Sequence, residues 1–182
     1  IYPLSLHDAL PICVGESGPI SLDASEAEMT ALRRKAEQLG LTLASVGTGL
    51  GWQYPLTSSD PDIHAKGIEA TSRAIRITQW LGATSMLVVP GMVTPDISYD
   101  EALENALTSM QELTPMAEQS DVVLGIENVW NKFLLSPVEL RDFIDYCESD
   151  YIGAYVDTGN IILYGYPEQY LRILGSYVCA VH

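Results

Sequence analysis

The feature of this chain that most constrains its fold is a strict alternation between short apolar runs and amphipathic segments. Five apolar runs read as strands, at residues 41–47, 84–91, 122–127, 151–157 and 177–182. The segments between them carry the periodicity of helices. Strands that are apolar on both faces are typical of parallel strands covered by helices. The pattern therefore predicts an α/β fold built on a parallel sheet.

Local signals place the ends of the predicted helices. A residue that favours helix N-caps precedes each of four periodic segments, at Ser25, Asp60, Ser98 and Ser136. Glutamate stands three residues after Ser25 and after Ser98, which predicts two capping boxes. Glycine follows the first two helices, at residues 40 and 82, and a shorter helix is expected over 168–174.

The sheet is expected to curl into a barrel rather than to stay open. No G-x-G-x-x-G or Walker loop follows any predicted strand, so the usual nucleotide-binding reason for an open sheet is missing. A closed (β/α)₈ barrel typically needs about 250 residues, and this chain has 182. The length and the pattern together predict an incomplete (β/α)₈ TIM barrel.

Composition excludes several classes of function. Lys and Arg total 9 against 24 Asp and Glu, and the resulting charge of −15 disfavours a nucleic-acid partner. The apolar runs are too short to span a membrane, and the first residues lack the basic start of a signal peptide. The three cysteines show no zinc spacing and are typical of a reducing compartment. We therefore expect a cytoplasmic protein.

The first twelve residues stand apart from the rest. LSLHDALPI, residues 4–12, closely resembles translated sequencing-adapter read-through, and the stretch has no clear periodicity. A natural amphipathic start is the alternative. We interpret residues 1–12 as a non-native segment that forms no strand pairing, and residues 13–182 as the partial barrel.

Three successive predicted strands end in residues that bind metals: Glu127, Asp157 and His182. In a parallel barrel the carboxyl ends of the strands converge on one mouth. A single acidic residue at a strand end is often a helix cap, and Asp157, which precedes Thr-Gly-Asn, is open to that interpretation. Three such residues after purely apolar runs favour a metal site.

The same segments resemble a known family. GIENVWNKF (125–133), YVDTGN (155–160) and the terminal VH are similar to the strand-end motifs of xylose-isomerase-like barrel sugar isomerases and epimerases. The closest branch comprises L-ribulose-5-phosphate and L-xylulose-5-phosphate 3-epimerases and hexulose-phosphate isomerase-like proteins. By this resemblance about strands three to seven are present.

The resemblance implies a metal-dependent mechanism. Glu127, Asp157 and His182 would be three ligands of one divalent cation, Mn²⁺, Mg²⁺ or Co²⁺, with Zn²⁺ also compatible. The family's fourth ligand, a glutamate at the end of the eighth strand, has no counterpart in this sequence. Isomerisation beside a carbonyl passes through an enediolate, and Glu127 would be the catalytic base that takes the substrate proton. The chain as given is expected to be inactive.

Substrate-binding residues are expected on the loops at the mouth. The better-known ketose epimerases have a histidine where this chain has Asn160, and a glutamate near the position of Leu134. These departures favour the sugar-phosphate branch over free ketohexoses. Asn160 is a candidate for hydrogen bonds to a sugar hydroxyl, Lys132 for a phosphate or hydroxyl, and Trp52 for stacking on a sugar ring. Lys132 as a solvated lysine and Trp52 as a packing residue are the alternatives.

Other functions remain open beside a sugar or sugar-phosphate isomerase. An inosose dehydratase-like lyase of the same superfamily would use the same metal. An AP-endonuclease-like DNA-repair enzyme would need further histidine ligands and a basic groove, neither of which this chain offers. The expected partner is a small-molecule sugar or sugar phosphate, and a homo-oligomer is compatible with the sequence.

Overall fold

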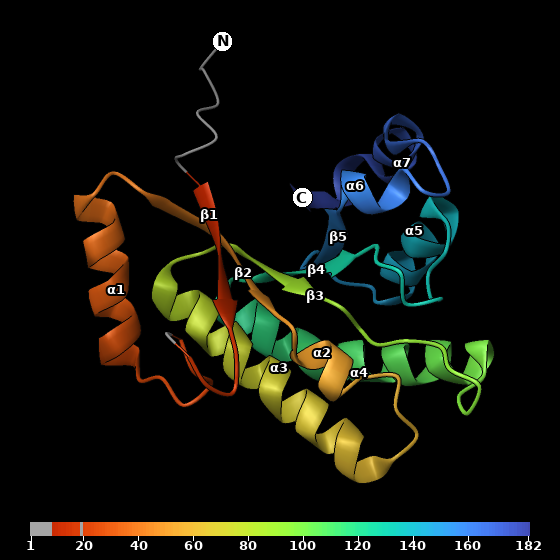
Figure 1. Ribbon diagram of the computed structural model, residues 1–182, viewed down its shortest axis with the longest axis horizontal. Coiled ribbons are helices and arrows are strands. Elements are labelled where there is room, and N and C mark those ends of the chain that lie inside the picture. The colour runs from red at the N-terminus through yellow and green to blue at the C-terminus, as the bar shows by residue number, and fades with distance from the viewer. Residues whose placement is uncertain (1–8, 19) are drawn as a thin grey trace.

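A computed structural model describes residues 9–18 and 20–182, and its core is one sheet of six parallel strands. The strands pair in sequence order, and the sheet curls into an incomplete TIM barrel (Figure 1). The predicted fold class is therefore confirmed. The strands are β1 (Ala9–Val14), β2 (Thr42–Thr48), β3 (Ser85–Val88), β4 (Val123–Glu127), β5 (Ile152–Val156) and β6 (Val178–Val181).

Helices connect the strands. They are α1 (Glu26–Gln38), α2 (Leu50–Gln53), α3 (Pro61–Leu81), α4 (Tyr99–Ser120), α5 (Pro137–Tyr146), α6 (Thr158–Ile161) and α7 (Pro167–Leu174), and a 3₁₀ turn (Gly175–Tyr177) leads into β6. Within residues 9–18 and 20–182, no helix combines the length and hydropathy that crossing a bilayer requires.

The predicted caps form as expected, with one difference. The side chains of all four predicted N-cap residues accept a hydrogen bond from a backbone N–H of the first helical turn. The capping box of α1 is complete, because the carboxylate of Glu28 also accepts from the backbone N–H of Ser25. At α4 the box is only half formed. The Glu101 carboxylate accepts instead from the hydroxyl of Ser59, which comes from the loop before α3.

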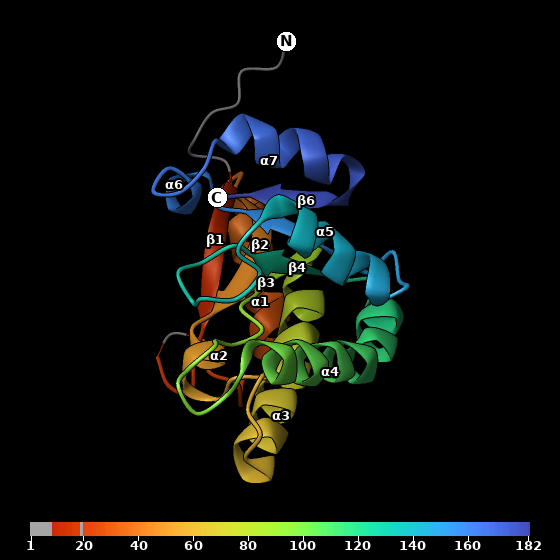
Figure 2. The same cartoon turned by 90° about the vertical axis from the view of Figure 1, so that its right-hand side faces the viewer.

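The core lies between the sheet and the helices that follow one another around its outside (Figures 1 and 2). Helices α1, α3 and α4 pack side by side, and α5 packs on α7. The larger cluster of buried side chains includes Met86, Leu124 and Ile126 from the strands. A smaller cluster, with Val14 and Val46, lies under α1 and α3. This packing fixes the strand ends on which the site is built.

The start of the chain differs from the prediction. Ala9–Val14 pairs in parallel with β2, from Ala9 opposite Thr42 to Val14 opposite Thr48. The expectation of no strand pairing is therefore wrong for residues 9–12, and residues 1–8 lie outside the described part of the chain. Pro11 does not prevent pairing because β1 is an edge strand, where a missing N–H is tolerated, and the register shifts between Leu10 and Pro11. The sheet thus holds one strand more than predicted, while the proposed boundary at residue 13 stays a prediction.

The inner face of the sheet is packed by a few side chains beside two glycines. A Cβ atom at Gly125 would lie 2.8 Å from the Sγ of Cys179, and a Cβ at Gly153 would lie 3.2 Å from the same sulfur. Between β2 and β5, the buried hydroxyls of Ser45 and Tyr155 form a 2.7 Å hydrogen bond. This bond joins two strands that are not neighbours in the sheet, so it supports the curl on which the site depends.

Candidate metal centre

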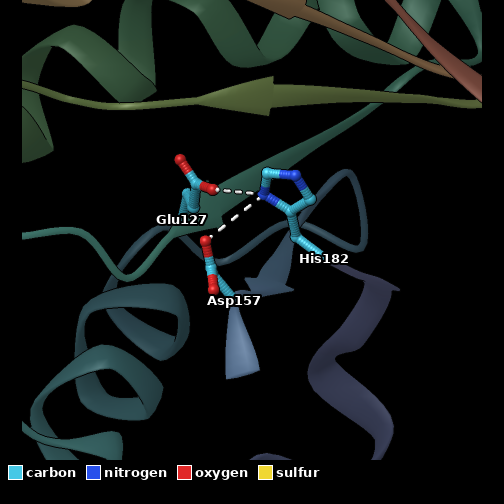
Figure 3. Close-up of side chains that lie close together, drawn as sticks. All are labelled: Glu127, Asp157 and His182. Atoms are coloured by element: carbon cyan, nitrogen blue, oxygen red, sulfur yellow. Dashed lines mark hydrogen bonds and ion pairs between the residues drawn. The ribbon is translucent and has the colours of Figure 1, made fainter. Parts of the chain in front are cut away.

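Three polar side chains meet at the carboxyl ends of neighbouring strands (Figure 3). Glu127 is the last residue of β4, Asp157 follows β5 directly, and His182 follows β6 directly. Parallel pairing brings these strand ends to the same edge of the sheet. The Nδ1 atom of His182 lies 3.1 Å from Oε1 of Glu127 and 3.3 Å from Oδ2 of Asp157. The predicted convergence of the three residues is confirmed.

The spacing and chemistry of these three residues fit a divalent cation. One ligand atom from each residue lies within 4.8 Å of the other two. Six-coordinate cations with bonds of about 2.1 Å hold neighbouring ligand atoms roughly 3 Å apart, which is close to the two distances from His182. Two carboxylates with one imidazole form a donor set that suits Mg²⁺, Mn²⁺ or Co²⁺.

The electrostatics of the site also favour a cation. Glu127 is only 8% exposed, and burial raises the pKa of its carboxyl group. The hydrogen bond from His182 lowers that pKa, and the nearby charge of Asp157 raises it. In the part of the chain that the structure describes, His182 is the one ion-pair partner of either carboxylate. Two adjacent carboxylates, one of them buried, are stabilised by a positive charge between them.

Asp157 also caps a helix. Its Oδ1 accepts a 2.8 Å hydrogen bond from the backbone N–H of Asn160 in the first turn of α6. The helix-cap interpretation of Asp157 is therefore correct, and it is compatible with the position of Asp157 beside Glu127 and His182. The cap leaves Oδ2 directed toward His182.

Two further residues at the site were not singled out from the sequence. The side chain of Asn128 bonds to the backbone of Asp157, and the ring of Tyr155 lies edge-on to His182 with the ring centroids 6.4 Å apart. Asn128 directly follows Glu127 in the I-E-N motif. Tyr155 stands two residues before Asp157, and the two-residue period of a strand places it on the same face. These two positions in the sequence could therefore have identified Asn128 and Tyr155 as site residues.

The predicted substrate-binding residues differ in how they lie relative to Glu127, Asp157 and His182. Asn160 lies at the site, where it contacts Asp157. Lys132 is exposed on the loop after β4, with a φ of 59°, and Trp52 is 45% exposed in α2. No hydrogen bond or ion pair among the described residues joins the side chain of Lys132 or Trp52 to the three clustered residues. Trp130 is connected more closely, since its Nε1 donates to the backbone oxygen of Asn160.

Curated relatives align with most of the chain at low identity. L-ribulose-5-phosphate 3-epimerase UlaE from Salmonella paratyphi A is 24% identical over 162 residues, which cover 88% of this chain and 57% of the relative. The enzyme of the same name from Escherichia coli O157:H7 is 24% identical over 166 residues, with the same coverage. This chain therefore spans little more than half the length of these relatives.

Solved structures share the fold more extensively. A D-psicose 3-epimerase structure in the presence of D-fructose matches with a TM-score of 0.83 at 17% identity, covering 96% of this chain and 62% of that one. The D-psicose 3-epimerase from Clostridium cellulolyticum H10, with D-tagatose, matches with a TM-score of 0.80 at 20% identity, covering 96% and 62%. At these identities the likeness shows the fold.

The match to a protein family covers nearly the whole chain. A sequence model described as xylose isomerase-like TIM barrel matches residues 8–182. That range includes all three clustered residues and leaves out residues 1–7. The parallel strands, their order and the strand-end cluster agree with it. The chain therefore belongs to the xylose isomerase-like TIM barrel family.

Proposed function

We propose that this chain, extended to the length of its relatives, is a divalent-metal-dependent isomerase or epimerase of a sugar or sugar phosphate. The observation that carries the proposal is the convergence of Glu127, Asp157 and His182 at one edge of the barrel sheet. Two of the similar proteins support the substrate class: UlaE is named as an L-ribulose-5-phosphate 3-epimerase, and one of the solved structures is named as a D-psicose 3-epimerase.

In this proposal the three clustered residues hold the cation. Bound there, the cation would polarise the substrate carbonyl and stabilise the negative charge of an enediolate. Glu127 takes the proton from the carbon beside the carbonyl. Burial suits it to this task, since a carboxylate with a raised pKa is a better proton acceptor. By the family resemblance, a second carboxylate beyond the present sequence acts from the opposite face.

The surrounding loops supply the candidate substrate contacts. Both amide hydrogens of Asn160 are engaged by protein acceptors, so its Oδ1 is the atom that we expect to accept from a sugar hydroxyl. Lys132 is exposed and positively charged, which suits a phosphate. Trp52 presents an exposed ring that suits stacking on a sugar.

A substrate panel tests the proposal. The extended protein, freed of metal by chelation, would be supplied with L-ribulose 5-phosphate or D-psicose, and the sugars would be separated by chromatography. We expect turnover only after Mn²⁺, Mg²⁺ or Co²⁺ is added. Full turnover in the chelated protein would contradict metal dependence. Loss of water in place of epimerisation would reassign the site to the dehydratase reaction.

A further inference from the structure

The backbone of Asp157 is held by a neighbouring side chain. Asn128, only 3% exposed, accepts a 2.8 Å hydrogen bond from the Asp157 N–H and donates a 2.9 Å bond to the Asp157 carbonyl. The backbone ladder between β4 and β5 ends one residue earlier, with Glu127 opposite Tyr155. The Asn128 amide therefore continues the pairing of β4 with β5 past its last backbone pair. On the β6 side, the backbone of His182 bonds to Val156 and Thr158, so Asn128 holds Asp157 from the β4 side.

The carboxylate of Asp157 is held by a second asparagine. Oδ1 accepts from the backbone N–H of Asn160, and Oδ2 accepts from the Asn160 Nδ2, both at 2.8 Å. The remaining hydrogen of Nδ2 is donated to the carbonyl of Asn128 at 3.0 Å. Because both oxygens are bonded, rotation of the carboxylate is restricted. Its Oδ2 is held 3.3 Å from His182.

We propose that Asn128 and Asn160 form a clamp that orients Asp157 toward Glu127 and His182 before any cation binds. The clamp is a property of the protein alone, and its effect on cation affinity rests on the proposed function. Both asparagines act through Asp157 and are positioning residues. A ligand held in advance in its binding orientation loses less conformational freedom when the cation arrives. Residues that orient metal ligands typically change affinity by about 10- to 100-fold when they are removed.

A control asparagine exists at a distance from the site. Asn105, in α4, donates from its Nδ2 to the carbonyl of Thr57 at 3.1 Å and to the hydroxyl of Ser59 at 3.2 Å. Like Asn128, it joins two chain segments through its side-chain amide. Asn105→Ala therefore removes a comparable link without contact to Glu127, Asp157 or His182, and it controls for a general loss of stability.

Mn²⁺ affinity, measured from the free-ion electron paramagnetic resonance signal, tests the effect of the clamp. We expect Asn128→Ala to raise the dissociation constant about 10- to 100-fold. Asn160→Ala should raise it less, because the backbone N–H to Oδ1 bond remains, and Asn105→Ala should leave it unchanged. Dissociation constants in Asn128→Ala and Asn160→Ala equal to that of the unaltered chain would overturn the proposal. If Asn128→Ala does not fold, the Mn²⁺ dissociation constant of Asn160→Ala decides whether the clamp affects cation affinity.

Hydrogen exchange in the metal-free protein tests the clamp independently of the proposed function. The Asp157 N–H donates to Asn128, so Asn128→Ala should accelerate its exchange at least tenfold relative to the amides of β5. Unchanged exchange would overturn the clamp. Absence of Mn²⁺ binding in both the unaltered chain and the extended protein would instead refute the proposed metal centre. The exchange rate of Asp157 would still decide whether the clamp exists.

Discussion

Asp157 shows how a single side chain serves the fold and the site at once. One carboxylate oxygen caps α6, while the other faces His182. A capping carboxylate has a fixed direction because it is bonded to the helix backbone. The position of α6 thus sets the direction of a candidate metal ligand, so a choice between cap and ligand is not required.

Glu127 and Asp157 are expected to respond differently to amide substitution in the extended protein. Glu127→Gln removes the proton acceptor, while its amide oxygen can still approach a cation. Loss of a general base typically costs about 10²- to 10⁴-fold. We expect solvent deuterium incorporation at the substrate carbon to fall by this amount even at saturating Mn²⁺. Asp157→Asn should mainly weaken Mn²⁺ binding, so that saturating Mn²⁺ restores exchange. Undiminished exchange in Glu127→Gln would refute its role as base.

The buried pair Ser45 and Tyr155 gives a prediction for stability. Tyr155→Phe or Ser45→Ala leaves one buried hydroxyl without its partner, which costs about 1–3 kcal/mol of unfolding free energy. The double variant removes both hydroxyls and should be more stable than the sum of the single changes implies. Urea unfolding of the four proteins measures this coupling. Tyr166→Phe, at an exposed tyrosine, is the control and should change stability little. If the losses of unfolding free energy in Ser45→Ala and Tyr155→Phe simply add in the double variant, the bond contributes nothing.

At the scale of elements, the sequence predicted the regular parts well and the edge poorly. Helix α3 begins after Asp60 and ends before Gly82, as the cap signals indicated. Strand β1 was missed although ALPICV is apolar throughout, because residues 1–12 were interpreted as a non-native segment. Pro11 was also a signal against a strand, but an edge strand tolerates it. Helix α6 was missed because four residues are too few to show a helical period. The convergence of the three site residues was predicted from strand ends, but the Asn128 clamp depends on three-dimensional contacts that have no periodic signal.

The capping box of α1 provides a pH-dependent prediction. The hydrogen bonds that the Glu28 carboxylate accepts from the backbone N–H and the hydroxyl of Ser25 lower the pKa of Glu28 from its ordinary value. A carboxyl group whose pKa is lowered by folding contributes stability above its unfolded pKa, and this contribution is lost as pH falls through the folded pKa. Ser25→Ala should cost about 1 kcal/mol at neutral pH. The difference between the two proteins should narrow well below pH 4.5, since protonated Glu28 accepts more weakly.

Urea unfolding at neutral pH and at a pH well below 4.5 measures the difference in unfolding free energy between the unaltered chain and Ser25→Ala. Ser17→Ala, at an exposed serine outside any helix, is the control and should change stability little at either pH. A constant difference between the unaltered chain and Ser25→Ala across this range would show that the charge of Glu28 does not strengthen the cap.

At the scale of the whole molecule, the sheet is curled but not closed. β1 and β6 lie at opposite ends of the strand order, and within the described residues each has a strand neighbour on one side only. A TIM barrel has eight strands, against six here. The side chain of His182 is 57% exposed, whereas Glu127 is buried. One side of the candidate metal centre is therefore open to solvent.

This openness leads to a prediction about chain length. We expect the 182-residue chain to bind Mn²⁺ more weakly than a chain extended to the length of the UlaE relatives, and to catalyse no epimerisation. Closure of the barrel would restrict His182 and, by the family resemblance, would bring in the second carboxylate that we propose. Site geometry must hold within about 0.5 Å for catalysis. Parallel Mn²⁺ titrations and sugar assays on the two proteins make the comparison. Equal turnover by both would show that the described strands alone form a working site, and the role proposed for a second carboxylate would then be wrong.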